Sequence, residues 1–131
     1  MKNSILSKTE QAVMDLLAQN LFGAGKSSLA DCSFKDVWSE AYVQAVPLLA
    51  FASGLACGSE QDKMKLRAEI NTLVSHNSRR IGEHMFIHKL FTEADIPYTI
   101  IKGFACSLYY SDPMLRLLGD VDFLVDPQDM N

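Results

Sequence analysis

Apolar residues recur at helical spacing along the first part of the chain, and turn-forming residues divide them into helices. Ser7 to Glu10 has the S-x-x-E form of a capping box, so a helix is predicted to begin there and to end at Gly23 to Gly25. A second helix is predicted from near Ser33. Pro47 interrupts its pattern because proline lacks the amide hydrogen and crowds the preceding turn. A short, buried helix is predicted over about residues 47–56.

One long helical pattern then runs from Glu60 to about Ala94. Charged and polar residues lie between its apolar positions and indicate a solvated face. The predicted buried stripe consists of Leu66, Ile70, Leu73, Asn77, Ile81, Met85 and Leu90.

The pattern changes after Ile96-Pro97, which ends the long helix. Residues 98–101 are rich in β-forming types and predict a strand. A short helix over residues 103–110 and a turn at 111–113 are predicted next, followed by a second strand over 120–125 whose apolar residues would anchor it in a core. The predicted fold class is therefore α+β, with helices first and a strand–helix–strand unit after them.

Composition narrows the class of protein. The 131 residues suit a single sizeable core, and hydrophobic residues make up 48% of them. A net charge of −4 argues against a surface built mainly to bind nucleic acid, which needs clustered Lys and Arg. Three widely spaced cysteines, Cys32, Cys57 and Cys106, favour a reducing compartment over a disulfide framework. Without a signal core or a long apolar run, a soluble cytoplasmic protein is expected.

Asp120 and Asp122 are the first candidates for chemistry. Residues two apart in a strand point to the same face, with Cβ atoms about 7 Å apart. Both carboxylates could then approach the same metal ions, and magnesium prefers carboxylate and phosphate oxygens. An isolated D-x-D is more often simply solvated, so this pair needs support from other residues.

That support comes from Lys102-Gly103, where the first strand turns into the short helix. Backbone amides at a helix N-terminus bind phosphate, and glycine lets the phosphate approach closely. Lys102 could add a positive charge. The alternatives are a glycine that only serves the turn and a lysine in solvent.

Together these segments resemble a family of uncharacterised nucleotidyltransferases, within the DNA polymerase β-like superfamily, whose hallmark is L-K-G … Y-P-x-P … R-x-x-x-D-[IL]-D-L-L-V. Residues 93–97 also resemble the family's approach to its first strand, and the close match spans roughly residues 77–127. The hallmark segments here are Ile101 to Gly103, Tyr109 to Pro113, Leu115-Arg116 and Gly119 to Val125.

Membership in this family implies a mixed sheet with flanking helices and transfer of a nucleoside monophosphate from a nucleoside triphosphate. By resemblance, Asp120 and Asp122 are the metal-binding and catalytic pair, with two Mg²⁺ ions expected and Mn²⁺ as an alternative. Gly103 matches the phosphate-side glycine. Arg116 matches the family's arginine, and Lys102 joins it as a candidate for offsetting phosphate charge. The expected partner is a nucleoside triphosphate, with no membrane partner and an unspecified acceptor.

The sequence also departs from the superfamily. Gly103 stands alone where many members carry a second small residue, and the superfamily's third carboxylate comes from a later strand, for which residues up to Asn131 offer no candidate. We therefore expect a helical region over 1–95 and the start of an incomplete catalytic domain over 96–131. This chain alone is expected to be inactive, and an unpaired sheet edge would favour self-association.

Two other functions remain open. A D-x-D also binds metal–nucleotide-sugar in glycosyltransferases, but those usually place a β/α nucleotide-binding half before the motif. A catalytically inactive nucleotidyltransferase fold that serves as a binding module is the alternative from another class. His84 and His88 have a metal-ligand spacing, but without a third matching ligand they are expected to be structural. Arg79-Arg80 are expected to be solvated or to pair with Glu83.

Overall fold

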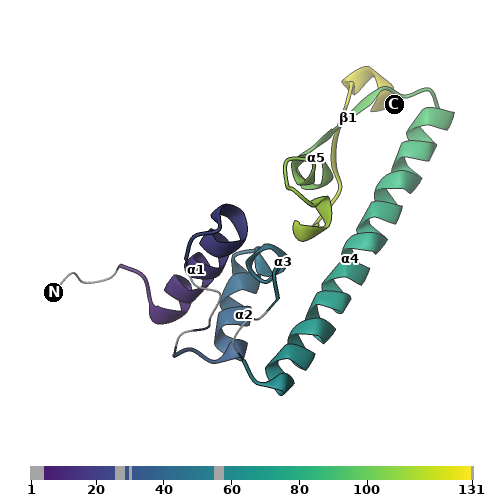
Figure 1. Cartoon of the computed structure of the whole chain (residues 1–131). Helices are drawn as coiled ribbons and strands as arrows, with labels where there is room; N and C mark the ends of the chain where they lie inside the picture. The colour runs from purple at the N-terminus through teal and green to yellow at the C-terminus, as the bar shows by residue number, and fades with distance from the viewer. Residues whose placement is uncertain (1–4, 26–28, 30, 55–57, 131) are drawn as a thin grey trace. The chain divides into compact units, whose positions relative to one another are not determined.

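The computed structural model describes residues 5–25, 29, 31–54 and 58–130, and Figure 1 traces the chain through them. Cys57 and Asn131 lie outside the described residues. The chain divides into two compact units, residues 1–71 and 72–131, which are described separately below.

The first unit begins with helix α1, Lys8–Phe22, whose predicted ends are both confirmed. Ser7 and Glu10 form the complete capping box, with the Glu10 amide donating to Ser7 Oγ at 3.2 Å and the Ser7 amide donating to the Glu10 carboxylate at 2.7 Å. Gly23 ends α1 in the left-handed conformation, with φ of 64°, which glycine adopts without steric penalty.

Helix α2, Phe34–Val43, begins after Ser33, whose hydroxyl accepts from the backbone amide of Asp36. Helix α3, Pro47–Ala50, places Pro47 at its first turn, where a missing amide hydrogen breaks no helical bond. The predicted range of 47–56 for this helix was too long, because Phe51 to Ser53 form a turn and residues 55–57 lie outside the described part.

The core of the first unit lies between α1, α2, α3 and the first turns of α4, Glu60–Glu93. Three aromatic rings, Phe34, Trp38 and Phe51, pack against one another with centroids 5.3–5.9 Å apart. Leu66 and Ile70 bring α4 into the same cluster, so this half of the α4 stripe is confirmed.

The second unit combines the rest of α4 with two strands, β1 at Tyr98–Ile101 and β2 at Asp122–Val125. The strands pair antiparallel, with Tyr98 opposite Val125 and Ile101 opposite Asp122. Between them lie α5, Gly103–Ser107, and the short helix η1, Pro113–Leu115; η2, Pro127–Met130, follows β2. The predicted α+β class and the strand–helix–strand order are confirmed.

Three details of this unit differ from the prediction. β2 begins at Asp122 and not at Asp120, because β1 ends at Ile101 and offers no partner beyond Asp122. α5 ends at Ser107, since the amides of Tyr109 and Tyr110 donate to carbonyls three residues back, as in a 3₁₀ turn. Leu124 is 59% exposed, so the described two-stranded sheet covers β2 less completely than a core strand requires.

The stripe on α4 also follows a different line after Asn77. Asn77 is fully buried, as the stripe predicted, but Met85 and Leu90 are 67% and 48% exposed. His84 is only 5% exposed and takes the buried place. His84 follows Asn77 by seven residues, which is two helical turns, so both side chains lie on the same face of α4. Met85 and Leu90, reached by spacings of four and five residues, lie off that face.

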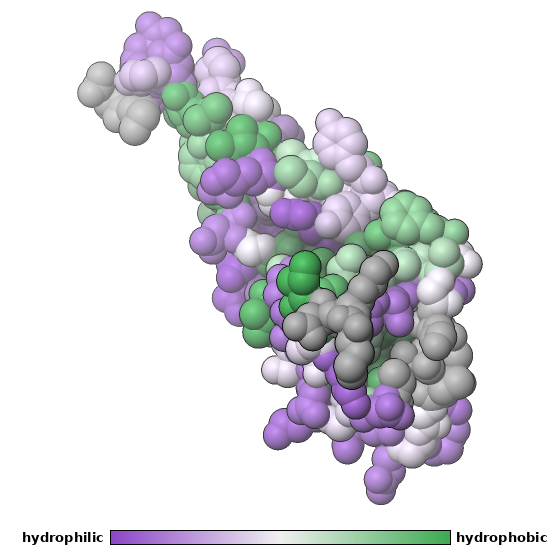
Figure 2. Space-filling view, turned by 90° about the vertical axis from the view of Figure 1, so that its left-hand side faces the viewer, coloured by the Kyte–Doolittle hydropathy of each residue, from purple (hydrophilic) through white to green (hydrophobic). Residues whose placement is uncertain are grey.

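Large apolar side chains remain exposed in both units, and Figure 2 shows hydrophobic residues at the surface among hydrophilic ones. Exposed apolar surface of this kind favours association between proteins, and the predicted self-association stays a prediction. Within the described residues, no helix has the length and apolar character needed to cross a membrane. The large apolar side chains that are more than half exposed in the described residues are Ile5, Met14, Phe22, Tyr42, Val43, Met64, Met85, Phe86, Leu108, Tyr109 and Leu124.

Candidate functional site

Gly103 and Asp120 are neighbours in the second unit, although 17 positions separate them in the sequence. A Cβ placed on Gly103 would lie 3.2 Å from the carbonyl oxygen of Asp120. The strand register explains this contact. Ile101 pairs with Asp122 in an antiparallel register, so Gly103, two residues after Ile101, lies beside Asp120, two residues before Asp122. The turn after β1 and the segment before β2 therefore form one local surface.

Helix α5 begins at Gly103, as predicted. Its first helical hydrogen bond runs from the Cys106 amide to the Lys102 carbonyl at 3.1 Å. By helix geometry, the amides of residues 103–105 precede that bond and have no helical acceptor. A helix of five residues has only a small dipole, so these amide hydrogens themselves are the groups suited to an anion.

Lys102 has an uncommon backbone conformation, with φ of 53° and ψ of −145°. Positive φ is unusual for any residue with a Cβ, and this combination lies near a region that glycine almost alone occupies. The side chain is exposed. Strained residues of this kind are found at tight turns and at functional sites, and the role of the Lys102 side chain stays a prediction.

Arg116 joins this local surface from the loop after η1. Its Nε donates to the carbonyl oxygen of Gly103 at 3.2 Å, and its guanidinium carbon lies 5.9 Å from the centre of the Tyr110 ring. The guanidinium therefore has a fixed direction, with its charge beside the start of α5. The structure thus brings together Gly103, Arg116 and the backbone of Asp120.

Asp120 is exposed before β2, and Asp122 is half-buried as its first residue. Within the described part of the chain, neither carboxylate has a salt bridge or a side-chain hydrogen bond with the protein. Nor does that part contain a cluster of three or more His, Cys, Asp or Glu side chains arranged to hold a metal. Two hard oxygen donors without a protein cation suit magnesium, with substrate oxygens and water completing its ligands. The assignment of this pair to metal remains a prediction.

Two polar residues on α4, which the sequence did not single out as functional, contact the loop before β2. Asn77 Nδ2 donates to the carbonyls of Met114 and Arg116, at 2.9 and 2.8 Å, and Asn77 Oδ1 accepts from the Leu118 amide at 2.9 Å. His76 Nε2 lies 2.9 Å from the Leu118 carbonyl. An asparagine in an otherwise apolar stripe was the available signal, because a buried amide needs partners.

The two histidines with metal-ligand spacing have other surroundings. His84 packs on Phe104 with ring centroids 5.4 Å apart, and within the described residues neither ring nitrogen has a hydrogen-bond partner. Its burial lowers the pKa of the imidazole, and the nearby Glu83 carboxylate opposes that shift. His88 Nδ1 lies 2.7 Å from the Tyr98 hydroxyl. These contacts fit the predicted structural roles.

Arg79 and Arg80 both form ion pairs with Glu83, at 3.3 and 2.7 Å. Pairing with Glu83 was one of the two alternatives predicted for these arginines, and it is confirmed. The single Glu83 carboxylate therefore offsets one of their two positive charges on α4.

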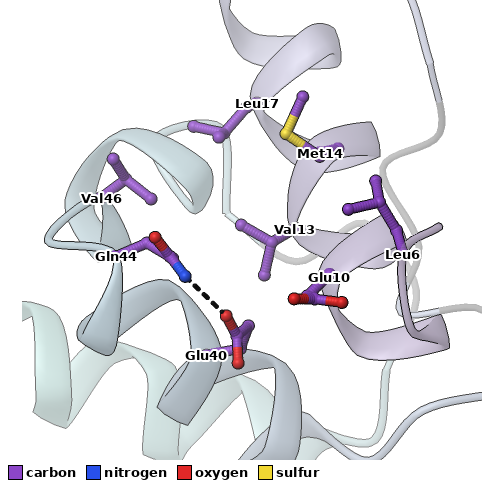
Figure 3. Close-up of a pocket in the computed structure, with 8 residues that line it drawn as sticks. All are labelled: Leu6, Glu10, Val13, Met14, Leu17, Glu40, Gln44 and Val46. Atoms are coloured by element: carbon purple, nitrogen blue, oxygen red, sulfur yellow. Dashed lines mark hydrogen bonds between the residues drawn. The ribbon is translucent and has the colours of Figure 1, made fainter.

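A groove of about 350 Å³ lies in the first unit between α1 and the end of α2 (Figure 3). Val13, Leu17 and Val46 supply apolar walls, and Glu40, which accepts a hydrogen bond from Gln44 at 2.9 Å, lies at its edge. The residues that line this groove include none of the predicted site residues.

The second unit therefore combines an antiparallel strand pair, a glycine at the strand-to-helix turn and a carboxylate pair at the head of the second strand. These features agree with the α+β class that the resemblance implied. The mixed sheet that it also implied is not found among the described residues, whose two strands are antiparallel. The model of a family described as uncharacterised nucleotidyltransferase matches residues 48–131, and the chain belongs to this family. No curated protein and no solved structure matched the chain.

Proposed function

We propose that this protein is a metal-dependent nucleotidyltransferase that transfers a nucleoside monophosphate from a nucleoside triphosphate to an acceptor. The observation that carries the proposal is the contact of the Gly103 turn with the backbone of Asp120. Because the Gly103 turn and the Asp120 backbone are adjacent, a single triphosphate could contact both the amides of the turn and the carboxylates. Widely separated groups could not share one triphosphate.

Each residue has a distinct role in the proposal. Asp120 and Asp122 hold the metal ion, with Mg²⁺ expected and Mn²⁺ as the alternative. The amides of residues 103–105 bind phosphate oxygens, and Gly103 lets the turn pack against the backbone of Asp120. Lys102 and Arg116 offset the negative charge of the triphosphate.

The bound metal would supply neutralisation of phosphate charge and a fixed place for the attacking and leaving oxygens. What the chain itself contributes is orientation. Arg116 is directed by its bond to the Gly103 carbonyl at 3.2 Å, so its charge is set before substrate arrives. Preorganised donors of this kind stabilise developing charge without a reorganisation penalty during the reaction.

The first test is nucleotide binding by the 131-residue chain, measured by titration calorimetry with ATP, GTP, CTP and UTP in turn. Binding is expected in the presence of Mg²⁺ or Mn²⁺ and to weaken strongly in EDTA. Asp120→Asn and Asp122→Asn keep the side-chain shape but remove one negative charge each, so each is expected to weaken metal-dependent binding by about tenfold or more.

Asp95→Asn is the matched control. Asp95 is exposed in the same unit, before the opposite end of β1, and its φ of 56° is one that asparagine also tolerates. It removes the same charge without touching the site, so its affinity should equal that of the wild type. Equal losses in all three variants would indicate a general charge effect and would refute the metal assignment.

Transfer is measured separately on the product of the native gene, with α-³²P-labelled triphosphates and cell extract as the source of acceptors. Incorporation that requires metal and both aspartates supports a transferase. Metal-dependent binding without incorporation from any labelled nucleotide would favour the inactive binding module.

A further inference from the structure

Asn77 is the most fully satisfied buried polar side chain in the described part of α4, and all its bonds go to one loop. Both Nδ2 hydrogens are used, on the carbonyls of Met114 at 2.9 Å and Arg116 at 2.8 Å. Oδ1 accepts from the Leu118 amide at 2.9 Å. The side chain has no solvent exposure, so water does not compete for these bonds.

His76, the preceding residue on α4, completes the contact. Its Nε2 lies 2.9 Å from the Leu118 carbonyl, and since a carbonyl only accepts, Nε2 carries the proton. Both backbone polar groups of Leu118 are therefore bonded to side chains of α4. The Leu118 side chain is itself only 2% exposed, so this point of the loop is fixed by packing as well.

The loop needs such support because residues 116–121 lie between η1 and β2 without a strand partner. Buried backbone groups outside helices and sheets must find side chains or water. An apolar residue at position 77 would suit the stripe of α4. It would, however, leave the carbonyls of Met114 and Arg116 without a donor and the amide of Leu118 without an acceptor.

The loop that α4 fixes carries the proposed site. Arg116 accepts from Asn77 through its carbonyl while its guanidinium donates to Gly103. Leu118 precedes Asp120 by two residues. The hydrogen bonds of His76 and Asn77 therefore act on the segment that sets Arg116 and Asp120 against the start of α5.

We propose that Asn77 and His76 are positioning residues for metal–nucleotide binding, acting by holding residues 114–118 in place. The inference rests on the proposed function, because the ligand whose binding it affects is the metal-bound triphosphate. Neither side chain touches the reacting groups in this proposal; both act through the backbone of the loop.

The variants separate the hydrogen bonds from the packing. His76→Ala removes the donor to Leu118, whereas His76→Gln places an amide NH₂ near the position of Nε2 and should restore the bond. Asn77→Asp keeps the shape and the acceptor for the Leu118 amide but removes both donors. Ser78→Ala is the matched control, because among the described residues the Ser78 hydroxyl donates to the Val74 carbonyl on its own helix, at 2.9 Å, and not to the loop.

Two measurements are made on each variant of the full chain. Titration calorimetry gives the affinity for MgATP, or for the triphosphate that the wild type binds best. Amide hydrogen exchange, followed without nucleotide, reports the local opening of residues 114–120. Circular dichroism verifies that each variant is folded.

His76→Ala is expected to weaken MgATP binding by about tenfold and Asn77→Asp by more, since a shift of about 1 Å in a positioning segment can reduce function 10²-fold. Exchange of residues 114–120 should accelerate in both. His76→Gln and Ser78→Ala should stay within about twofold of the wild-type affinity, the first because its donor is retained and the second because it never contacts the loop.

The outcomes separate this inference from the function on which it rests. If the wild type binds MgATP and the folded His76→Ala and Asn77→Asp variants bind it with the same affinity as the wild type, the positioning role alone is overturned. If Ser78→Ala loses as much affinity as His76→Ala, the effect comes from α4 in general and the inference is again overturned. A wild type that binds no triphosphate would refute the proposed function, and the positioning role with it, whatever the exchange data show. Should Asn77→Asp fail to fold, the comparison of His76→Ala with His76→Gln still decides the matter.

Discussion

Replacing Lys102 by glycine should make the protein more stable while weakening nucleotide binding. The perturbation follows from the backbone of Lys102, whose φ of 53° and ψ of −145° lie where residues with a Cβ are strained. Glycine has no Cβ and adopts this conformation freely. The same change removes the positive charge that the proposed function assigns to phosphate.

The size of the effect can be worked from two opposing quantities. Strained backbone conformations of this kind cost about 1–3 kcal/mol, which glycine would recover. Glycine also gives the unfolded chain more freedom, which reduces the gain by about 0.4–1 kcal/mol. A net stabilisation of about 1 kcal/mol is expected, or an increase in melting temperature of roughly 3–8 °C for a chain or unit of this size.

Lys102→Ala is the control that separates charge from backbone, because alanine removes the ammonium group but retains the Cβ. Thermal unfolding by circular dichroism should rank Lys102→Gly above both Lys102→Ala and the wild type. Calorimetry should show weaker metal–triphosphate binding in both variants and near wild-type binding in Lys102→Arg. A glycine variant less stable than the alanine variant would show that Lys102 is unstrained in solution and would refute the expected stabilisation.

Three further changes test other parts of the structure. Gly103→Ala should destabilise the protein by about 1–2 kcal/mol and abolish triphosphate binding, because φ is +32° and the new Cβ would lie 3.2 Å from the Asp120 carbonyl; normal stability and affinity would contradict the proposed phosphate turn. Gly82→Ala, in the middle of α4, should raise the free energy of unfolding by about 0.5–1 kcal/mol, since its Cβ meets nothing within 4 Å, and a loss measured by urea unfolding would show an unseen close contact. Burial holds the pKa of His84 below 6.5, so the unfolded chain takes up the proton first; the stability due to neutral His84 is complete above about pH 6.5 and is lost as the pH falls toward the lower folded pKa. His84→Gln should remove that part of the decline between pH 7.5 and 5.5, and an unchanged pH profile would contradict the burial of a neutral imidazole.

Local sequence was sufficient for most element boundaries, because the signals act within a few residues. The capping box at Ser7 and Glu10 acts across a single turn, and so does the left-handed glycine at Gly23. The first strand and the start of α5 at Gly103 were likewise predicted from neighbouring residues. The family, too, followed from four short motif segments within residues 101–125.

Pairing between distant segments decided what local patterns could not. The start of β2 depends on where β1 ends, so Asp120 lies outside the strand although strand-forming residues follow it from Val121. The buried face of α4 beyond Asn77 depends on the loop and helix that pack there, which favour His84 over the more hydrophobic Met85.

For the candidate site, the sequence alone led to the residues proposed to carry the chemistry, since Asp120, Asp122 and Gly103 stand in a motif whose residue types suit metal and phosphate. Their arrangement was decided by the tertiary structure. The antiparallel register brings Gly103 to Asp120, and the bond from Arg116 to the Gly103 carbonyl fixes a charge there. Asn77 appears in sequence as one polar position in an apolar stripe, and only the folded chain gives it partners, 37 to 41 residues away. Hydrogen-bond partners so far apart in the sequence are set by the packing of whole elements, which no local pattern encodes.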